Sequence, residues 1–246
     1  MSPIGVILAA GMASRLRPLT DERPKCLLTV GTRTLLERTV DALLQAAIKE
    51  IVVVTGYRSE MIRQFLTTHY DKESATFHFI HNADYEHNNN IFSLWLARSV
   101  VEGRTFLLLD SDILFDPAIV ARMAEQPGTS LALNRHELGD EEIKVVPNEK
   151  GQVVALSKTC PISQAIGESV GIEKIDAAYS TARYAELRQM IEGEGLVDVF
   201  YEKAFERLIP QGHLFTFTDT TDLFSMELDT VDDFNNAREL IPPALF

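Results

Sequence analysis

Cysteine, tryptophan and positive charge are all scarce in this chain. Its 246 residues include two cysteines, Cys26 and Cys160, and one tryptophan. Two cysteines are too few for a disulfide framework and suit a protein of the reducing cytoplasm. Lysine and arginine together number 23 against 36 aspartates and glutamates, which gives a net charge of −13. Because no basic run offsets this charge, we expect no binding to nucleic acid or to an anionic membrane, and any phosphate ligand needs a local pocket with a divalent cation.

Long hydrophobic segments and two familiar nucleotide motifs are also missing. The apolar run Ile4–Ala10 covers about a third of a membrane span, so we expect neither a transmembrane helix nor a signal peptide. No G-x-G-x-x-G follows the first predicted strand, which argues against a dinucleotide-dependent oxidoreductase. No G-x-x-x-x-G-K-[ST] occurs, which excludes a P-loop ATPase or GTPase. Repeats and Pro-, Gly- or Ser-rich linkers are absent, so residues 1–246 are predicted to form a single domain.

The hydrophobic pattern differs between the two halves of the chain. In residues 1–135, predicted strands alternate with predicted helices, in the order Ile4–Leu8, Leu35–Ile48, Ile51–Thr55, Ser59–Thr67, Ile91–Val101 and Phe106–Leu109. This alternation predicts a mostly parallel sheet with helices on both faces. In residues 136–246 we expect a hairpin and further mixed elements at Lys144–Val146, Val153–Ser157, Ser169–Ile175, Ala182–Ile191, Tyr201–Leu208, His213–Phe217 and Val231–Leu240. The predicted fold class is therefore α/β, with a Rossmann-like mixed sheet.

The stretch Leu8–Leu28 combines small and basic residues in an order that suits a polyphosphate. A predicted strand leads into Ala9–Gly11, whose small side chains let backbone amides approach phosphate oxygens closely. Arg15 can make bidentate contacts with a phosphate, and Lys25 can supply a point charge where negative charge develops. Taken alone, Ala-Ala-Gly is equally compatible with a simple turn beside a solvated basic surface.

This stretch resembles the N-terminal signature of the nucleotidyltransferases that join a nucleoside triphosphate to a phosphorylated small molecule. The signature reads L-A-A-G-x-x-x-R-(L)-x-P-L-T…P-K-x-L, and its elements stand between Leu8 and Leu28. The resemblance implies a nucleotide-diphospho-sugar transferase fold, with a nucleotide-binding half (1–135) and an acceptor-binding half with a closing helix (136–246). It implies that Arg15 contacts the β- and γ-phosphates and that Lys25 steadies the α-phosphate. It also implies nucleotide contacts from Leu8, Ala9, Ala10, Gly11, Met12, Ala13 and Ser14.

Two acidic segments are candidates for a divalent-cation site. Asp110 and Asp112 follow a predicted strand, at the edge where open α/β sheets place their ligands, and Mg²⁺ binds a few carboxylates together with water and phosphate. Glu227 and Asp229 lie far downstream, where Thr230 could instead cap the last helix. In the resembling family one metal acid follows a strand and a small residue, and another opens the last helix. The resemblance therefore implies Asp112 and Asp229 as Mg²⁺ ligands, with Asp110 and Glu227 as second choices.

A polar cluster of Asn88, Asn89, Asn90 and Ser93 precedes an apolar helix pattern. Asparagine amides carry the donors and acceptors that distinguish bases, although residue type alone favours a loop in which Asn90 caps the helix. The Asn-Asn-x-x-Ser-Leu pattern resembles the branch that contains bacterial CTP:phosphocholine and aminoalkylphosphonate cytidylyltransferases. The resemblance implies CTP as the nucleotide, and it places Gly56, after the second strand, near the base.

Two later segments resemble the acceptor site of the same branch. Lys158, at the end of a predicted strand, is implied to hold the acceptor phosphate. Tyr201 and Glu202, with Glu173, are implied to surround a cationic head group, because carboxylates and aromatic faces attract ammonium ions. Residue type alone favours a core position for the aromatic residues of this segment.

Together these features imply a cytoplasmic, Mg²⁺-dependent cytidylyltransferase. An acceptor oxygen would attack the α-phosphorus of CTP and release pyrophosphate; it is already anionic, so no general base is needed. Catalysis would come from positioning and charge neutralisation by Arg15, Lys25, Lys158 and the metal. The expected acceptors are phosphocholine, phosphoethanolamine and 2-aminoethylphosphonate. The alternatives are a sugar-1-phosphate uridylyl- or thymidylyltransferase and a non-catalytic, nucleotide-binding regulatory subunit.

Overall fold

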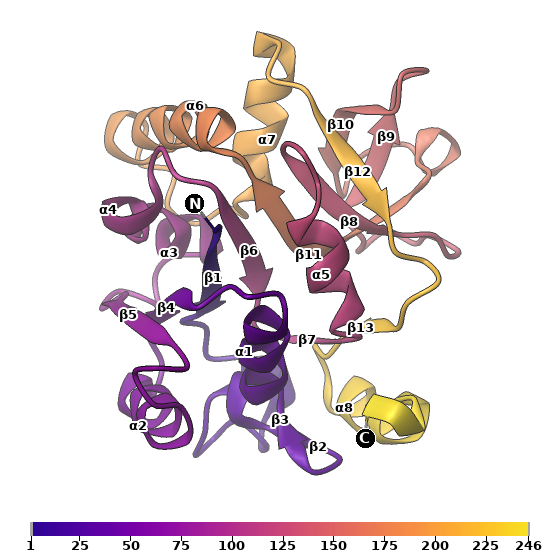
Figure 1. Cartoon of the computed structure of the whole chain (residues 1–246). Helices are drawn as coiled ribbons and strands as arrows, with labels where there is room; N and C mark the ends of the chain where they lie inside the picture. Colours follow the sequence, from indigo (N-terminus) through magenta and orange to yellow (C-terminus); the bar gives the residue numbers. More distant parts are fainter. Residues whose placement is uncertain (1, 246) are drawn as a thin grey trace.

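A mixed sheet of nine strands forms the centre of the protein in the computed structural model, which describes residues 2–245 (Figure 1). Across the sheet the strand order is β5-β4-β1-β6-β11-β8-β12-β10-β9. In chain order these strands are β1 (Ile4–Ala9), β4 (Glu50–Thr55), β5 (Thr76–His81), β6 (Phe106–Asp110), β8 (Ser130–Asn134), β9 (Lys144–Pro147), β10 (Gln152–Ser157), β11 (Gly167–Ile175) and β12 (Phe215–Asp219).

The strand directions confirm the predicted mixed, mostly parallel sheet. Strands β5, β4, β1 and β6 run parallel to one another, and β12 runs parallel to β8. Strand β11 is antiparallel to both β6 and β8, and β10 is antiparallel to both β12 and β9. Only β11 and β10 of this sheet therefore run against the others within residues 2–245. The carboxyl ends of β1 and β6 lie at the same edge, where ligands bind in open α/β sheets.

Helices cover both faces of the sheet, as predicted. On one face α3 (Asn90–Leu96), α6 (Ala177–Arg188) and α7 (Glu202–Leu208) bury side chains such as Tyr184 and Phe205 against the strands. On the other face α1 (Leu35–Gln45), α2 (Ser59–His69) and α5 (Ala118–Ala124) bury side chains such as Val40 and Val120. Strand β1 lies between the two layers and is buried along its whole length, which explains its continuous apolar sequence.

A third, smaller core joins the two ends of the chain. Helix α8 (Val231–Leu240) packs Phe234 and Ala237 against Leu16 and Leu28 from the N-terminal segment. Two short antiparallel sheets of two strands each support this contact: β2 (Thr29–Val30) pairs with β3 (Arg33–Thr34), and β7 (Ile113–Phe115) pairs with β13 (Ser225–Glu227). Figure 1 shows α8 beside β13 and below the main sheet. The last helix therefore closes onto the first loop.

Two predicted helices differ from the observed ones by more than a few residues at one end. The predicted helix Ile91–Val101 is divided into α3 and α4 (Arg98–Val101) at Ala97. Helix α6 begins at Ala177 rather than Ala182, because the Asp176 side chain accepts hydrogen bonds from two backbone amides of the first turn. None of the helices in residues 2–245 is long and apolar enough to cross a membrane.

Among the longer elements of the first half, β5, β8 and α5 have no counterpart among the predicted ones, and neither do the short strands β2, β3 and β7. Strand β5 forms one edge of the sheet, and its sequence Thr-Phe-His-Phe-Ile-His is interrupted by histidines, which leaves no long apolar run to detect. Strand β8 is buried but has the sequence Ser-Leu-Ala-Leu-Asn, in which β-branched residues are missing. Both β5 and β8 are strands because of their position in the sheet, which the local sequence does not specify.

Candidate active site

A cleft of about 650 Å³ opens where β1 and β6 end, and both halves of the chain line it. Most residues predicted for the site face this cleft: Leu8, Ala10, Gly11, Ala13, Arg15, Lys25, Asn88, Asn89, Asn90, Ser93, Asp110, Asp112, Lys158, Glu202, Glu227 and Asp229. The remaining predicted residues are not among those that line it: Ala9, Met12, Ser14, Gly56, Glu173 and Tyr201. The fold thus gathers residues from both chain halves at the predicted sheet edge.

The loop after β1 is shaped to admit a ligand at Gly11. A Cβ atom built on Gly11 would meet no atom within 4 Å, so the backbone faces open space. Ala13 adopts a left-handed conformation with a φ of 48°, which costs an alanine about 1 kcal/mol. Its carbonyl accepts hydrogen bonds from the Thr20 hydroxyl at 3.0 Å and from the Leu16 amide at 3.0 Å. These bonds fix the turn that presents Arg15 to the cleft.

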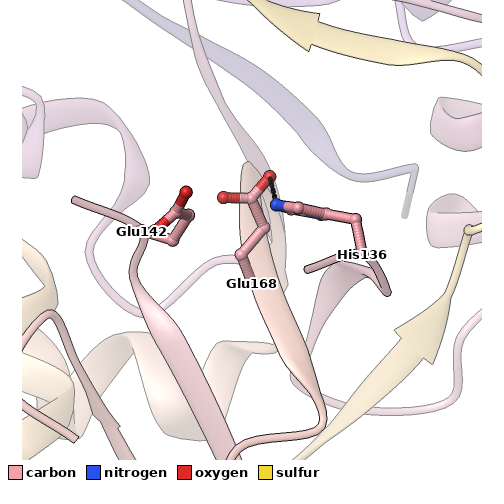
Figure 2. A group of neighbouring side chains, drawn as sticks. All are labelled: His136, Glu142 and Glu168. Carbon is pink, nitrogen blue, oxygen red and sulfur yellow. Dashed lines mark ion pairs between the residues drawn. The ribbon is translucent and has the colours of Figure 1, made fainter. Parts of the chain in front are cut away.

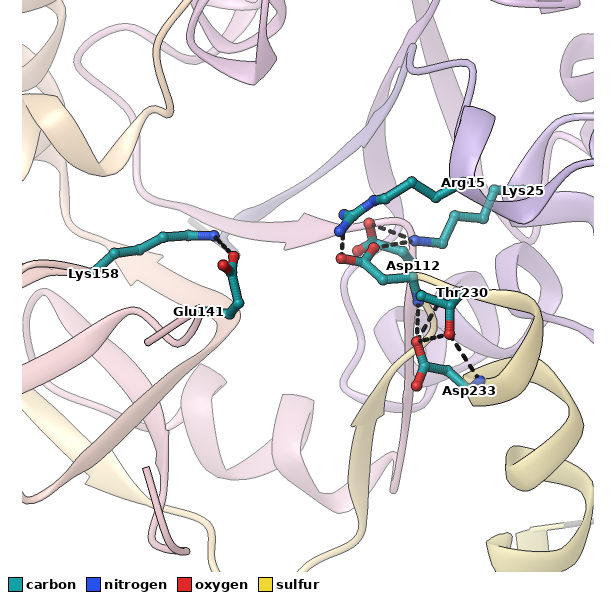
Figure 3. A network of polar contacts seen from close by, with 8 residues as sticks. Arg15, Lys25, Asp112, Glu141, Lys158, Thr230 and Asp233 are labelled. Atoms are coloured by element: carbon teal, nitrogen blue, oxygen red, sulfur yellow. Dashed lines mark hydrogen bonds and ion pairs between the residues drawn. The ribbon is translucent and has the colours of Figure 1, made fainter. Parts of the chain in front are cut away.

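Lys25 joins two acids that are distant in sequence. Its Nζ atom lies 3.0 Å from Asp112 Oδ2 and 2.9 Å from Asp229 Oδ1 (Figure 3). The residue is only 8% exposed, and burial alone would lower its pKa. The two carboxylates outweigh burial and raise the pKa of Lys25 above its ordinary value. The lysine is therefore a fixed positive charge at the centre of this group.

Asp229 also pairs with Arg15, whose guanidinium donates to Oδ2 at 2.5 Å. Burial opposes ionisation of Asp229, but Lys25 and Arg15 together hold its pKa below the ordinary value. The segment is held by a capping box, in which the Thr230 side chain and the Asp233 side chain each bond the other's backbone amide. Thr230 is thus the helix cap, and Asp229 is nevertheless free to face the cleft.

Asp112, Glu227 and Asp229 form a compact set of oxygen ligands. Strand β13 pairs Glu227 with Ile113, and the Leu228 amide donates to the Asp112 carbonyl at 3.0 Å. One carboxylate oxygen from each acid lies within 4.8 Å of the other two. Burial and the two neighbouring aspartates raise the pKa of Glu227 to about 7. Three converging carboxylates are the donor chemistry that Mg²⁺ binds, so these residues fit such an ion.

Asp110, the other second choice for a metal ligand, is held by a different contact. Its Oδ2 atom accepts a hydrogen bond from the Tyr201 hydroxyl at 3.1 Å, and that hydroxyl also lies 3.1 Å from Glu173 Oε1. Burial and the neighbouring carboxylates raise the pKa of Asp110 well above its ordinary range. Asp110 lines the cleft, but it is not part of the compact set.

The asparagine cluster is ordered by a residue that the sequence did not single out. Asn82 is buried, and its amide donates to Asn88 Oδ1 at 2.7 Å and to Ser93 Oγ at 3.1 Å. The helix cap is Asn89 rather than Asn90, since the Asn89 side chain accepts from the first helical amide. Asn90 instead accepts from the backbone amide of residue 201 at 2.9 Å. Asn82 directly follows β5, and without that strand its position at the sheet edge could not be inferred.

Gly56 packs closely against two residues that line the cleft. A Cβ atom at this position would lie 2.6 Å from the Ala10 carbonyl oxygen and 2.7 Å from Tyr85 Cβ. Both Ala10 and Tyr85 line the cleft. Gly56 is therefore required by packing beneath these two residues.

On the opposite side of the cleft, Lys158 and Glu202 face the open space while two predicted partners do not. Lys158 Nζ pairs with Glu141 at 3.1 Å, across the cleft from Arg15 and Lys25 (Figure 3). Glu202 lines the cleft, and burial raises its pKa to about 7. Glu173 and Tyr201 are both 0% exposed and lie behind the cleft wall. Their side chains face the interior, which corrects the expectation that they contact the acceptor.

A further group on this side, His136, Glu142 and Glu168, was not identified from the sequence (Figure 2). One ligand atom from each lies within 4.8 Å of the others, and His136 Nε2 is 3.7 Å from Glu168 Oε1. The residues come from the segment after β8, the segment before β9, and β11. No regular spacing connects them, so only the fold could reveal the group.

Known proteins resemble this chain in sequence and in fold. The CMP-5'-(3-aminopropyl)phosphonate synthase of Streptomyces rubellomurinus is 35% identical over 125 residues, which is 51% of this chain and 19% of that protein. The bifunctional IPC transferase and DIPP synthase of Aquifex aeolicus is 27% identical over 242 residues, which is 98% of this chain and 52% of that protein. The chain thus spans about half or less of the length of these two curated relatives.

A solved structure and a family profile complete the comparison. The structure of CTP:phosphocholine cytidylyltransferase from Streptococcus pneumoniae superposes with a TM-score of 0.84 at 21% identity, and covers 98% of this chain and 100% of that one. At this identity the match shows a shared fold. The profile of the MobA-like NTP transferase domain matches residues 5–204, which include the loop after β1, Lys25, Asp112 and most of the opposite side of the cleft. The chain therefore belongs to the family of MobA-like NTP transferase domains.

Proposed function

We propose that this protein is a Mg²⁺-dependent cytidylyltransferase that transfers CMP from CTP to a small aminated phosphate or phosphonate. The observation that carries the proposal is the ion-pair group of Arg15, Lys25, Asp112 and Asp229 beside the open Gly11 backbone. It places two cations and a set of oxygen ligands at the strand edge where a triphosphate would lie. We call these residues, with Glu227, the phosphate end of the cleft.

The chain's own residues suit a transfer that works by positioning and charge neutralisation. Arg15 and Lys25 would contact the triphosphate, with Lys25 kept charged by its two acids. Asp112, Glu227 and Asp229 would hold Mg²⁺, which supplies charge neutralisation to the phosphates when bound. An acceptor oxygen forms the new bond to the α-phosphorus, and the bond to the bridging oxygen breaks with its electron pair leaving on pyrophosphate. The acceptor oxygen is already anionic, so no residue needs to remove a proton.

Lys158 would bind the acceptor phosphate from the other side. It lies across the cleft from Arg15 and Lys25, and Glu141 orients its ammonium group. We define the acceptor end of the cleft as His136, Glu141, Glu142, Lys158, Glu168, Phe200 and Glu202. Lys158 on one side of the cleft, facing Arg15 and Lys25 on the other, would allow two anionic reactants to approach each other, which they would not do unaided.

The choice of CTP and of an aminated acceptor rests on similarity and on the asparagine cluster. The Streptomyces relative is named as a CMP-5'-(3-aminopropyl)phosphonate synthase, and Asn88, Asn89 and Asn90 line the cleft with amide groups of the kind that can distinguish bases. A second candidate acceptor is a polyol phosphate, since the Aquifex relative, named in part as an IPC transferase, aligns with 98% of this chain.

A nucleotide and acceptor screen tests the proposal. The purified chain is incubated with Mg²⁺, each of CTP, UTP, dTTP and GTP, and each of 2-aminoethylphosphonate, phosphoethanolamine, phosphocholine, inositol 1-phosphate and glucose 1-phosphate. Pyrophosphate release and the mass of the nucleotide product are measured. We expect CTP with an aminated acceptor to give the highest kcat/KM. A preference for UTP or dTTP with glucose 1-phosphate would overturn the proposal, as would the absence of product with every pair.

A further inference from the structure

Lys158, which would bind the acceptor phosphate, has a fixed backbone and a side chain that still needs to be oriented. Its carbonyl oxygen accepts a hydrogen bond from Lys144 Nζ at 2.7 Å, and Lys144 is only 2% exposed. The Lys158 side chain itself is partly exposed and extends into the cleft (Figure 3). A lysine ammonium sits on a flexible four-carbon stem, so it binds an anion well only where neighbours limit its rotations.

Glu141 holds this ammonium group only weakly. Its carboxylate lies 3.1 Å from Lys158 Nζ, but the Glu141 side chain is 89% exposed. Ion pairs at this exposure contribute little, because water screens them and two long side chains must be ordered together. The orientation of Lys158 therefore calls for a second contact.

Phe200 supplies that second contact. Lys158 Nζ lies 5.3 Å from the centroid of the Phe200 ring, within the distance of about 6 Å at which a ring face attracts an ammonium ion. The Phe200 side chain is 48% exposed, so packing in the core does not account for its position. Both residues line the main cleft and also an adjoining hollow of about 360 Å³. The ring thus stands beside the ammonium group at the rim that the two spaces share.

The start of α3, on the nucleotide side of the cleft, holds the segment that carries Phe200. This irregular segment lies directly before α7. The Val197 carbonyl accepts a hydrogen bond from the Asn89 amide at 2.9 Å, and the Tyr201 amide donates to Asn90 Oδ1 at 2.9 Å. Phe200 lies between these two attachment points, so its position depends on both.

Asn90 makes the attachment that involves a side chain. The bond between Asn89 and Val197 joins backbone atoms, whereas the Tyr201 amide is bound by the side-chain oxygen of Asn90. Tyr201 is 0% exposed, and its hydroxyl donates to Asp110 at 3.1 Å, so the residue next to Phe200 is fixed at both its amide and its ring. Asn90 therefore connects the asparagine cluster to the acceptor end of the cleft.

We propose that Phe200 is a positioning residue for Lys158, and that Asn90 in turn positions Phe200. The proposal rests on the proposed cytidylyl transfer, in which Lys158 receives the acceptor phosphate, and it applies to any acceptor that carries such a group. The ring face orients the ammonium group, and the Asn90 oxygen keeps the ring in place. Asn90 thus serves the acceptor, although it belongs to a cluster expected to contact the nucleotide.

Removal of the ring tests the contact with Lys158. Steady-state kinetics are measured with Mg²⁺, CTP and the acceptor on which the parent protein is most active in the screen above. Phe200→Leu should raise KM for the acceptor by about threefold, the factor that an exposed cation–π contact contributes, and leave KM for CTP within about 1.5-fold. Phe200→Tyr keeps a ring face and should keep the parent KM. Equal losses in both variants, or no change in Phe200→Leu, would overturn the proposal.

A double-mutant cycle separates positioning from direct contact with the acceptor. Lys158→Met alone should raise KM for the acceptor at least about tenfold, because hydrogen bonds from a charged group are lost. In the Lys158→Met background, Phe200→Leu should have no further effect, since no ammonium group is left to orient. Lys150→Met, in the exposed turn between β9 and β10 that also contains Glu149, is the matched control and should leave the acceptor KM unchanged. The same threefold loss in both backgrounds would mean that the ring contacts the acceptor itself, and would overturn the proposal.

Substitutions of Asn90 test the second step. Asn90→Ala and Asn90→Asp both lose the amide nitrogen, but only Asn90→Asp keeps an oxygen that can accept from the Tyr201 amide. An acidic residue is favourable in the first turn of a helix, so Asn90→Asp should fold. We expect Asn90→Ala to raise KM for the acceptor by up to about threefold and Asn90→Asp to keep the parent value. Asn88→Asp adds the same charge to a side chain whose hydrogen bonds within residues 2–245 all go to Asn82 and Asp84, and should also keep it.

Two outcomes would contradict the role of Asn90. One is an equal acceptor KM in Asn90→Ala and Asn90→Asp, and the other is a further rise in acceptor KM when Asn90→Ala is added to Phe200→Leu. Thermal unfolding of each variant shows whether a change in KM accompanies a loss of folding. An absence of product from the parent protein with every pair of nucleotide and acceptor would overturn the proposed function and this proposal together. A working transfer with unchanged acceptor KM in Phe200→Leu would overturn this proposal alone.

Discussion

The two ends of the cleft are built in opposite ways. At the phosphate end the charges of Arg15, Lys25, Asp112 and Asp229 are satisfied by one another, at distances between 2.5 and 3.0 Å. At the acceptor end carboxylates of comparable burial have no such partners among the residues described, and Glu202 is the clearest case. One end is thus pre-organised before any ligand arrives, while the other leaves interactions to be completed by a ligand.

This difference suggests a division of labour. The phosphate end draws residues from the first loop, from the end of β6 and from the segment before α8. The third hydrophobic core holds these segments together. Changes there should affect the rate of transfer whatever the acceptor. Changes at the acceptor end should affect which acceptor is used. The following changes test that comparison in order of decreasing expected effect.

Asp112→Asn should have the largest effect. The variant removes one of the two acids that hold Lys25 and one member of the compact oxygen set. We expect kcat to fall by about 10³-fold, as when a principal electrostatic group is removed from an active site. The assay is pyrophosphate release with saturating CTP and acceptor. Asp232→Asn, an exposed aspartate in the first turn of α8, is the control. A kcat within tenfold of the parent value would remove Asp112 from the phosphate end.

Arg15→Met should have a smaller effect, because Lys25 remains in place. Arg15 lines the cleft and pairs with Asp229, whereas Arg17 is exposed and pairs with Asp21 at 3.4 Å. We expect kcat/KM for CTP to fall by about 10²-fold in Arg15→Met and by less than about threefold in Arg17→Met. Steady-state kinetics with varied CTP distinguish the two. Similar losses in both variants would mean that the local positive charge matters more than the pairing.

Much of the phosphate end could be predicted from the sequence, because its signals are local. A buried strand, small residues and a basic loop are contiguous in Leu8–Leu28, and Asp112 lies just after the end of a strand. What the sequence could not show is that Lys25 lies between Asp112 and Asp229, since that depends on the pairing of β7 with β13. Local patterns identify candidates, and long-range pairing decides which of them meet.

The acceptor end was predicted less completely for the same physical reason. His136, Glu142 and Glu168 come from three separate segments that only the fold brings together, and no local pattern marks them. Tyr201 was expected in contact with the acceptor by resemblance, while its residue type alone favoured the core, and the core is where it lies. Residue type was the better guide there, because a large ring beside a helix start buries more area inside than at a cleft wall.

Tyr201→Phe tests whether that residue acts on the phosphate end or on the acceptor. The variant keeps the buried ring and removes only the hydroxyl that contacts Asp110 and Glu173. We expect the Mg²⁺ concentration for half-maximal rate to rise a few-fold and the free energy of unfolding to fall by about 1–2 kcal/mol, because a buried acid loses its donor. KM for the acceptor should stay within twofold. An acceptor KM raised tenfold with unchanged Mg²⁺ dependence would return Tyr201 to the acceptor end.

Glu173→Gln should leave catalysis nearly unchanged and alter the pH dependence of stability. Burial raises the pKa of Glu173 to about 8, with Arg183 opposing the shift, against an ordinary value of 4.5. The folded state therefore keeps this proton to a higher pH than the unfolded state does. Its stabilising contribution is complete below pH 4.5 and is lost as the pH rises through 8, by up to about 1.4 kcal/mol per pH unit.

Unfolding of Glu173→Gln by denaturant at several pH values between 5 and 8.5 measures this loss. The parent protein should lose stability across the interval, and the glutamine variant should lose clearly less, because its amide does not titrate. Glu202, whose pKa burial raises to about 7, titrates in the same direction and leaves a residual slope. Glu149→Gln, in the exposed turn, should keep the full slope of the parent. If the free energies of unfolding of the parent and of Glu173→Gln change in parallel with pH, the interior behind the acceptor end binds no extra proton. Its carboxylates would then be charged like those of the phosphate end.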